Sequence, residues 1–442
     1  MQKLPPQDSK LAVYIETYGC QMNEYDSELV RAILLENGFR EVGDAAAADV
    51  VLLNTCAVRE NAHNRVFGRL QMLEHLYKDK ELTVGVLGCM AQNLKLELLA
   101  NDLHVDLIAG PDSYRSLPRL IREARDSGKQ ASSIDLSEFE TYDDIYPARK
   151  DGVNAWIAVM RGCDNFCTFC VVPYTRGRER SRPLESVVDE TKKLVSEGYS
   201  QVTLLGQNVN SYKHDGKSFA DLMRAVADVP GIKRVRFTSP HPKDFPDDLL
   251  DAIASHPHIC KHIHLPLQAG SDRILGLMRR LHTSDEYLKL VDHIRQMIPD
   301  ISLTTDIILG FPTETREEFE QTVQLVEKVR FDSAFIFNYS ERKGTVAGRR
   351  WPDDISSEEK KYRITLLNDI QNKINRSQNQ RHIGQVFDLL VEGPSRRSSS
   401  QWSGRNDYGH NVIFPHKNEK PGDYIQVKIL SATAVTLKGE RA

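Results

Sequence analysis

The chain has 442 residues, with 58 Lys and Arg against 62 Asp and Glu, which gives a formal net charge of −4. Hydrophobic residues make up 40% and charged residues 27%, so a wholly disordered chain and a fibrous protein are excluded. This length predicts roughly two to four domains. We expect a cytoplasmic protein, because no apolar run is long enough to span a bilayer and the N-terminus has no apolar stretch typical of a secretory signal.

The sequence contains seven cysteines. In a long cytoplasmic chain they are poor candidates for disulfides, and a metal-binding or catalytic role is the better interpretation. They are Cys20, Cys56, Cys89, Cys163, Cys167, Cys170 and Cys260.

The segment up to about residue 145 alternates short apolar runs with helical patterns. This alternation predicts an open parallel sheet with helices on its faces, in an α/β domain covering residues 1–145. Strands are expected at 12–16, 50–53, 84–87 and 105–108, and helices at 24–37, 58–76, 94–99 and 114–126. Residues 128–151 are polar and are expected to form an exposed linker.

A cysteine follows each of the first three expected strands, at Cys20, Cys56 and Cys89. The carboxyl ends of the strands in such a sheet lie on one edge, which carries the ligand crevice. We therefore expect the three cysteines to converge there, although three buried structural cysteines are the alternative.

A second α/β array follows and predicts a partial or complete (β/α) barrel over residues 146–380. Its strands are expected at 155–160, 201–205, 234–238, 262–265, 304–309 and 333–337, with helices at 185–196, 219–226, 247–255, 285–297, 316–329 and 358–380. Residues 381–442 have alternating patterns and turn residues typical of a small β-barrel of about five strands.

The last segment has nine cations and six anions, a net charge of 9 − 6 = +3 on a chain of negative charge. Basic and hydroxyl groups beside an aromatic ring suit a phosphate backbone with stacked bases. A solvated loop with a few arginines is the alternative. The candidate RNA-binding residues are Arg396, Arg397, Trp402 and Arg405.

The most specific local motif is the C-x3-C-x2-C run of Cys163, Cys167 and Cys170. Three thiolates can bind three irons of a [4Fe–4S] cluster, which leaves the fourth iron open for S-adenosylmethionine. A structural zinc site is disfavoured because it needs four ligands and normally shows paired C-x2-C spacing.

This spacing is the signature of the radical S-adenosylmethionine superfamily, which the sequence closely resembles. The resemblance implies that Phe169 packs near the adenine of the cofactor. Further polar residues and glycines fall at the ends of expected barrel strands, where (β/α) barrels place their active sites. The candidate cofactor-binding residues are therefore Phe169, Gln207, Asn208, Ser239, Gln268, Asp306 and Gly310.

Nearly the whole chain resembles the radical methylthiotransferase family. The resemblance rests on 17–27, 54–60, 88–92 and 170–182, and on the similarity of 386–437 to the TRAM domain, an RNA-binding module. It implies a second [4Fe–4S] cluster on Cys20, Cys56 and Cys89, and two S-adenosylmethionine molecules, one as methyl donor and one as source of a 5′-deoxyadenosyl radical. No catalytic residue beyond the cluster ligands is assigned.

The residues of these motifs most closely resemble those of the family members that methylthiolate N6-isopentenyladenosine at position 37 of tRNA. The expected partners are the tRNA anticodon stem-loop and an electron donor such as flavodoxin or ferredoxin, with no membrane. Three alternatives stay open: the same chemistry on a ribosomal-protein aspartate, the same chemistry on threonylcarbamoyladenosine in tRNA, and a non-catalytic iron–sulfur sensor that binds RNA.

Some residues have two interpretations of similar weight. Arg176, Arg178, Arg180 and Arg182 alternate in an extended stretch, where they suit either tRNA phosphates or local acidic partners. We interpret Cys260 as structural. The histidines nearby carry no complete metal pattern, and no metal site is predicted there.

Overall fold

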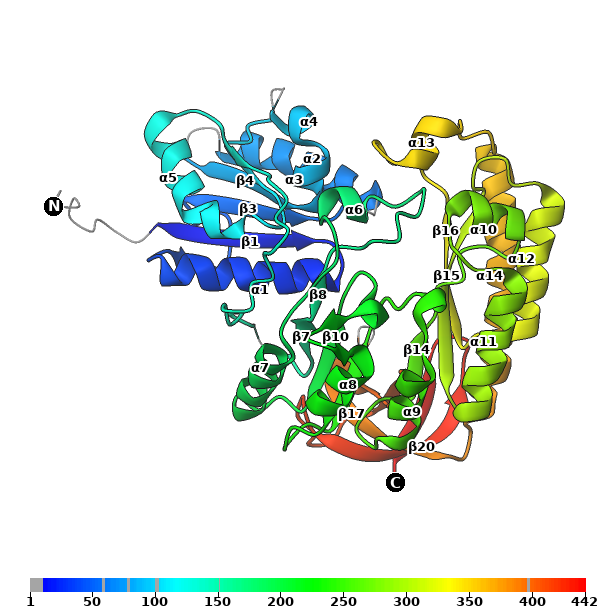
Figure 1. Ribbon diagram of the computed structural model, residues 1–442. Coiled ribbons are helices and arrows are strands. Elements are labelled where there is room, and N and C mark those ends of the chain that lie inside the picture. The colour runs from blue at the N-terminus through cyan, green and yellow to red at the C-terminus, as the bar shows by residue number, and fades with distance from the viewer. Residues whose placement is uncertain (1–10, 58–59, 78–79, 100–102, 151, 396–397) are drawn as a thin grey trace. The chain divides into compact units, whose positions relative to one another are not determined.

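The computed structural model describes residues 11–57, 60–77, 80–99, 103–150, 152–395 and 398–442 (Figure 1). The chain divides into two compact units. The first contains Met1–Lys150 with Arg161–Asp164 and Cys170–Arg180, and the second contains Asp151–Met160, Asn165–Phe169 and Ser181–Ala442.

The first unit is built on a six-stranded parallel sheet with the strand order β2-β1-β3-β4-β5-β6. Every residue of the central strands β3 and β4 is buried, as expected for strands covered by helices on both faces. In Figure 1, α1 lies on one face of this sheet and α2 to α4 lie on the other. The strands are β1 (Ala12–Tyr18), β2 (Arg40–Glu41), β3 (Val50–Thr55), β4 (Thr83–Gly88), β5 (Leu107–Ala109) and β6 (Ala131–Ser133).

The helices of this unit are α1 (Gln21–Glu36), α2 (Glu60–Tyr77), α3 (Cys89–Asn93), α4 (Lys95–Leu99), the 3-10 turn η1 (Tyr114–Ser116), α5 (Leu117–Ser127) and α6 (Val172–Thr175). The α/β sheet predicted from the sequence is confirmed, with two differences. The expected linker at 128–151 contains β6, which pairs in parallel with β5, and β2 adds an edge strand. With two and three residues, both strands are too short to show a period.

The second unit contains the six expected barrel strands. They form two three-stranded sheets, β13-β10-β7 and β14-β15-β16, joined by a parallel bridge between Val235 and Ile259 just before β14. Among the described residues β7 and β16 do not pair, so the barrel is partial. The strands are β7 (Ala155–Ala158), β10 (Gln201–Leu205), β13 (Arg234–Phe237), β14 (His262–His264), β15 (Ser302–Leu309) and β16 (Ser333–Asn338).

Helices α7 (Leu184–Ser196), α8 (Phe219–Ala227), α9 (Asp247–Ser255), α11 (Ser284–Met297), α12 (Arg316–Val329) and α14 (Ser357–Gln380) match the expected helices to within a few residues. Their apolar faces share one large core with the inner sides of the strands. The sequence did not predict several shorter elements: β8 (Met160–Arg161), β9 (Arg180–Ser181), η2 (Val209–Ser211), β11 (Lys213–His214), β12 (Lys217–Ser218), η3 (Pro242–Asp244), α10 (Asp272–Met278) and α13 (Val346–Arg350).

The C-terminal residues of this unit form a closed five-stranded barrel in the order β17-β18-β19-β21-β20, as predicted. It has its own core, and it packs on the start of β13, where buried Arg234 donates to the carbonyls of Arg405 and Asp388 at 2.6 and 2.7 Å. The strands are β17 (Val386–Ser395), β18 (Ser398–Arg405), β19 (Asn411–Pro415), β20 (Tyr424–Ala432) and β21 (Leu437–Arg441).

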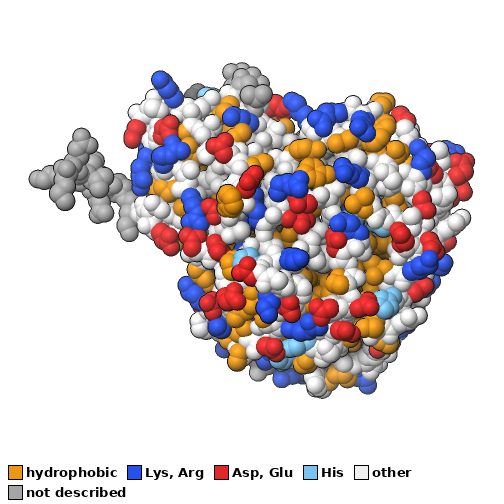
Figure 2. Space-filling view, in the orientation of Figure 1, with side chains coloured by type: hydrophobic (Ala, Val, Ile, Leu, Met, Phe, Trp, Pro, Cys, Tyr) orange, Lys and Arg blue, Asp and Glu red, His pale blue; other side chains and the backbone are white. Residues whose placement is uncertain are grey.

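Charged side chains of both signs are interspersed on the face seen in Figure 2, in keeping with the small net charge. In the part of the chain that the structure describes, no helix has both the length and the apolar character needed to cross a membrane.

Candidate active site

The three N-terminal cysteines lie at one edge of the six-stranded sheet. The ends of β1, β3 and β4 are in register, with Tyr18 beside Thr55 and Thr55 beside Gly88, so the residues that follow come to the same place. Cys20 then begins α1 as its N-cap and Cys89 is the first residue of α3. The structure thus brings together the three positions that the sequence predicted to converge.

Electrostatic contacts confirm this proximity. A hydrogen bond with Cys56 is the main cause that lowers the pKa of Cys20 to about 6, and the charge of Arg176 lowers it further. Burial raises the pKa of the Cys89 thiol, and the charge of Cys20 also raises it, while Arg176 lowers it. Iron binds cysteine as the thiolate, which the lowered pKa of Cys20 and the cation beside Cys89 favour.

A buried group of charges, here called the Asp26 group, lies next to these cysteines. It consists of Asp26, Arg161 and Arg176, whose side chains are 0%, 2% and 4% exposed. Asp26 Oδ1 accepts from Arg161 Nη2 at 2.8 Å, and Asp26 Oδ2 accepts from Arg176 Nη2 at 2.6 Å. Arg176 Nε donates to Cys89 Sγ at 3.1 Å.

The sequence analysis did not find the Asp26 group. One signal was present: Asp26 falls on the same helical face as Met22, Tyr25 and Leu29, all of them buried. An aspartate on such a face needs a partner. The partners, however, are 135 and 150 residues away along the chain, and sequence spacing does not reveal such pairs.

All four alternating arginines pair with acidic residues, which supports the second of their two interpretations. Arg180 lies 3.0 Å from Asp112 and Arg182 lies 2.7 Å from Glu190, and all four side chains are buried. Arg178 pairs at 2.8 Å with Asp164 but keeps 66% of its side chain exposed.

Cys163 and Cys170 belong to the first unit. The N–H of Cys163 donates to the carbonyl of Gly177 at 3.2 Å, and Cys170 Sγ accepts from the N–H of Val172 at 3.5 Å. The preceding Gly162 has φ +80°, and a Cβ there would overlap the carbonyl of Arg178. The turn into the motif therefore requires glycine.

Cys167 belongs to the second unit, where it is buried. Its Sγ accepts a hydrogen bond from Nη1 of Arg280 at 3.6 Å, and Nη2 of Arg280 donates to the carbonyl of Pro266 at 3.0 Å. Arg280 is itself buried, so one cysteine of the motif has a fixed positive charge beside it. The sequence analysis did not single out Arg280.

Backbone hydrogen bonds bring predicted cofactor-binding residues close together at the ends of barrel strands. Val209, next to Asn208, donates its N–H to the carbonyl of Ser239 at 3.2 Å. The N–H of Gln268 donates to the carbonyl of Asp306 at 2.9 Å. Ser239 and Gln268 have φ of +61° and +72°, a strained conformation that concentrates at functional sites.

The side chains of these residues are in different environments. Asn208 Nδ2 donates to Asp244 at 3.1 Å, and Gln207 is half-buried. Gln268 is 8% exposed, and its Oε1 is a buried atom without a hydrogen-bond partner among the described residues. Asp306 lies 3.2 Å from His264 Nε2.

The other two predicted residues contact the protein interior. Phe169 packs against an apolar cluster that includes Phe311, Met278 and Tyr339. Gly310 donates its N–H to Glu314 at 2.7 Å, and a Cβ on Gly310 would come within 2.7 Å of the Lys360 side chain. In this structure Gly310 thus allows a close approach of buried side chains.

Two exposed aromatic residues on β16 were not predicted as site residues. Phe335 and Phe337 are 54% and 47% exposed. Ala334 and Ile336, which alternate with them along the strand, pack instead against the core under the helices. Phe335 pairs in register with Asp306, and its ring centroid lies 6.0 Å from that of His264. The face of the sheet turned away from the helices therefore presents aromatic, acidic and imidazole groups together.

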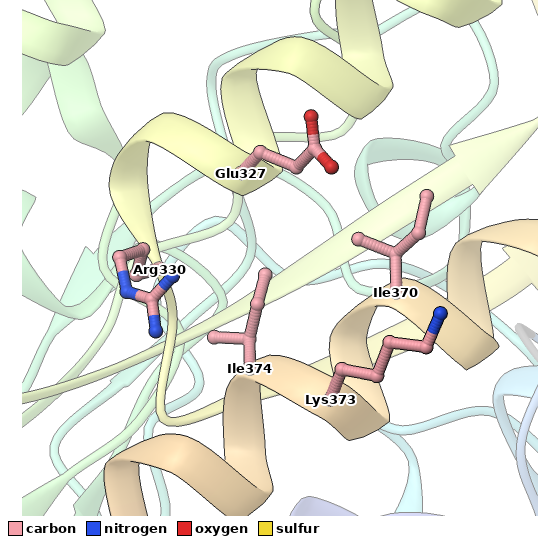
Figure 3. A pocket seen from close by; sticks show the side chains of 5 residues that line it. All are labelled: Glu327, Arg330, Ile370, Lys373 and Ile374. Atoms are coloured by element: carbon pink, nitrogen blue, oxygen red, sulfur yellow. The ribbon is translucent and has the colours of Figure 1, made fainter.

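A hollow of ≈ 290 Å³ lies elsewhere, between α12 and α14 (Figure 3). In Figure 3 it is lined by Glu327 and Arg330 from the end of α12 and by side chains of α14, and it contains none of the predicted site residues.

Of the candidate RNA-binding residues, Trp402 and Arg405 lie in β18. The ring of Trp402 stacks on His416 with centroids 4.1 Å apart and an interplanar angle of 8°. Arg405 pairs with Glu392 at 3.0 Å. Arg396 and Arg397 lie outside the described residues.

Within the described residues, no three His, Cys, Asp or Glu side chains are close enough to share a single metal ion. The cysteines of a cubane each bind a different iron and need not lie that close. Orphaned donors and acceptors nevertheless mark two places: Arg176 Nη1 is beside Cys89, and Gln268 Oε1 is at the ends of the barrel strands. The donor sets therefore fit iron–sulfur clusters and a polar cofactor.

Family models match most of the chain in the expected order. The model "Radical SAM superfamily" matches residues 157–326, "Uncharacterized protein family UPF0004" matches residues 12–110, and "TRAM domain" matches residues 380–441. The first match places the central region in a superfamily whose members use a [4Fe–4S] cluster and S-adenosylmethionine.

Full-length relatives specify the family. The chain is 48% identical to the tRNA-2-methylthio-N(6)-dimethylallyladenosine synthase of Chloroherpeton thalassium, over 98% of this chain and 96% of that protein. It is 46% identical to the synthase of the same name from Porphyromonas gingivalis, over 98% and 95%. The chain belongs to the family of tRNA-2-methylthio-N(6)-dimethylallyladenosine synthases, the MiaB-type methylthiotransferases.

Solved structures share the fold at low sequence identity. The radical S-adenosylmethionine methyltransferase TsrM from Kitasatospora setae, with cobalamin and a [4Fe–4S] cluster bound, is 16% identical with a TM-score of 0.59, over 77% of each chain. The cobalamin-dependent S-adenosylmethionine radical enzyme OxsB is 12% identical with a TM-score of 0.54, over 82% of this chain and 56% of that one.

Proposed function

We propose that this protein methylthiolates N6-isopentenyladenosine at position 37 of tRNA, beside the anticodon. The full-length identity of 48% to a synthase of that name carries the proposal. The cysteines at the sheet edge support it, because a second cysteine set is what separates methylthiolation from simple cofactor cleavage in this family.

Two sets of residues would hold the cofactors. Cys163, Cys167 and Cys170 would bind one [4Fe–4S] cluster, and Cys20, Cys56 and Cys89 the other. When bound, the clusters and two molecules of S-adenosylmethionine supply the radical and sulfur chemistry that replaces a hydrogen on the adenine with a methylthio group.

The chain's own residues orient these groups. Arg280 places a positive charge and a hydrogen-bond donor on Cys167 Sγ. Gln268 has a buried acceptor without a partner among the described residues, and Asp306 is held by His264. The target base must leave its stack to be reached, and exposed rings such as Phe335 offer a surface on which a base can stack.

We propose that each of the three domains expected from the sequence has its own role. Residues 1–145 would carry the auxiliary cluster, 146–380 the cofactor-cleaving barrel, and 381–442 the RNA-binding barrel. A flavodoxin or ferredoxin would supply the electrons.

The test uses anaerobically reconstituted protein with S-adenosylmethionine, a strong reductant and isopentenylated tRNA. Alanine at Cys163, Cys167 or Cys170 is expected to abolish 5′-deoxyadenosine. Alanine at Cys20, Cys56 or Cys89 is expected to keep this cleavage and lose methylthio product. Cys260→Ala is the matched control, since Cys260 is buried like four of the six cysteines but is expected to bind no cluster.

Substrate controls separate the alternatives. Product only on a ribosomal protein, or only on tRNA carrying threonylcarbamoyladenosine, would keep the chemistry and overturn the substrate. Absence of both deoxyadenosine and product, in protein shown to hold both clusters, would support the RNA-binding sensor instead.

A further inference from the structure

One side of the Asp26 group joins it directly to a candidate cluster ligand. The guanidinium of Arg176 uses Nη2 for Asp26 at 2.6 Å and Nε for Cys89 Sγ at 3.1 Å. A planar guanidinium can make these two bonds in different directions at once, and a lysine ammonium on a flexible stem does not reproduce that geometry. Asp26 therefore fixes the orientation in which Arg176 meets the thiol.

Asp26 is in turn held in place from several sides. Its two oxygens accept from Arg161 and Arg176, and the hydroxyl of buried Tyr114 also donates to Oδ2, at 3.1 Å. The ring of Tyr142 lies under Arg161, with 4.7 Å from the guanidinium carbon to the ring centroid. A carboxylate with these partners has little freedom to move, so the bond from Arg176 to Cys89 is preorganised.

The three side chains of the Asp26 group sum to one excess positive charge, which thiolates beside Arg176, free or bound to a cluster, would balance. The group contains two arginines and one aspartate, and the nearby Arg180 is neutralised by Asp112. An unbalanced charge this deeply buried is costly. A [4Fe–4S] core with two positive charges bound by three thiolates carries one net negative charge, which would balance the excess.

Buried nitrogen atoms of the Asp26 group also lack partners among the described residues. Nη1 of Arg176 and Nη1 of Arg161 have no hydrogen-bond partner among the described residues. Such orphaned donors are rare in folded proteins and need an explanation. The sulfur atoms of a cluster would be natural acceptors for the one on Arg176, which already contacts Cys89.

We infer that Arg176, oriented by Asp26, is a positioning residue for the auxiliary cluster: it donates a hydrogen bond to the Cys89 ligand and supplies the positive charge that raises the reduction potential of that cluster. The inference rests on the proposed function, because it requires a cluster on Cys20, Cys56 and Cys89. Reduction adds negative charge, and hydrogen bonds and positive charge at the sulfurs favour it.

The experiment isolates the auxiliary cluster in the full-length chain. A parent with alanine at Cys163, Cys167 and Cys170 keeps only the N-terminal cysteines. Iron content and an EPR-monitored redox titration are then compared between this parent and the same parent carrying Arg176→Gln. We expect Arg176→Gln to lower the midpoint potential, or to lose the cluster while circular dichroism shows an intact fold.

Two further variants keep the test decisive. Arg31→Gln removes another buried arginine of the first unit, one that pairs with Glu41 at 2.8 Å, and it is expected to leave the potential unchanged. Arg176→Lys keeps the positive charge but cannot make both hydrogen bonds, to Asp26 and to Cys89, in the same geometry. The potential of its cluster should therefore lie between those of the parent and Arg176→Gln. If Arg176→Gln does not fold, Arg176→Lys carries the same comparison.

The outcomes separate the inference from the proposed function. A parent that binds no iron would overturn both. A parent with a normal cluster, together with an Arg176→Gln or Arg176→Lys cluster of unchanged potential, would overturn the role of Arg176 and leave the auxiliary cluster in place.

Discussion

Arg280 Nη1 lies 3.6 Å from Cys167 Sγ, although the two residues are 113 positions apart in the sequence. Arg280 follows α10 and is buried, with its other terminal nitrogen fixed by the carbonyl of Pro266. The arrangement resembles the contact of Arg176 with Cys89 in the first unit. One cysteine of each predicted cluster thus receives a hydrogen bond from a buried arginine.

Arg280→Gln is expected to slow cleavage of S-adenosylmethionine, because it removes a donor and a positive charge from Cys167, a predicted ligand of the cleaving cluster. The measurement is the rate of 5′-deoxyadenosine formation per cluster, with cluster content determined by iron analysis. Arg279→Gln is the matched control, since Arg279 is adjacent but exposed. Equal rates in the two variants would remove Arg280 from the site.

A pH-dependent loss of stability is expected from His241. Burial, and then the charge of Arg280, lower the pKa of His241 to about 2 from its usual 6.5. The unfolded chain therefore takes up a proton below pH 6.5 that the folded chain does not take up until far lower pH. This contribution to stability is present above pH 6.5 and is lost progressively as the pH falls below it.

The variant His241→Asn should remove this contribution while keeping an acceptor for the N–H of Lys243, which now donates to Nδ1 at 3.2 Å. By linkage, His241 contributes about 2 kcal/mol less to stability at pH 5 than at pH 7. Urea unfolding at the two pH values measures the difference. An equally large drop in stability in His241→Asn would show that other groups cause it.

The helices and strands that the sequence predicted correctly are those whose apolar residues recur at a regular spacing and are buried. The in-register ends of β1, β3 and β4 could be predicted from the sequence, because three apolar runs each stop just before a cysteine. Contacts between charged residues far apart in the sequence could not be predicted. Asp26 and Arg161 are 135 residues apart, and no pattern around either residue identifies the other as its partner. Likewise, β6 lies in a polar stretch where only the neighbouring β5 makes it a strand.

Phe335→Ala is expected to reduce methylthio product without unfolding the protein. The ring is 54% exposed, so its removal costs little packing. If the target adenine stacks there, the loss is about 1–3 kcal/mol, on the order of five- to 150-fold in kcat/KM for tRNA. Tyr362→Ala on α14 is the matched control, with a similar exposure of 56%. Unchanged kcat/KM in Phe335→Ala would place the base elsewhere.

The RNA-binding role of the C-terminal barrel is better tested by a point substitution than by deletion from Gln385 onward. Buried Arg234 donates to the carbonyls of Arg405 and Asp388, and Arg236 donates to that of Asn406. Deleting the barrel would leave both arginines without these partners, so a loss of activity would not separate RNA binding from damage to β13.

Trp402→Ala leaves the partners of Arg234 and Arg236 in place. Its half-buried ring stacks on His416 and packs against the barrel core, so circular dichroism must first show an intact fold. A ring with one face covered by imidazole can still receive a base on the other face, and losing such a stack costs about 1–3 kcal/mol. We expect the Kd for tRNA to rise on the order of five- to 150-fold, while cleavage of S-adenosylmethionine without RNA stays the same. Val435→Ala, 77% exposed on the same barrel, is the control and should bind tRNA normally. If Trp402→Ala also binds tRNA normally, then tRNA does not stack on this ring, and the positive charge of the barrel is the remaining basis for its RNA-binding role.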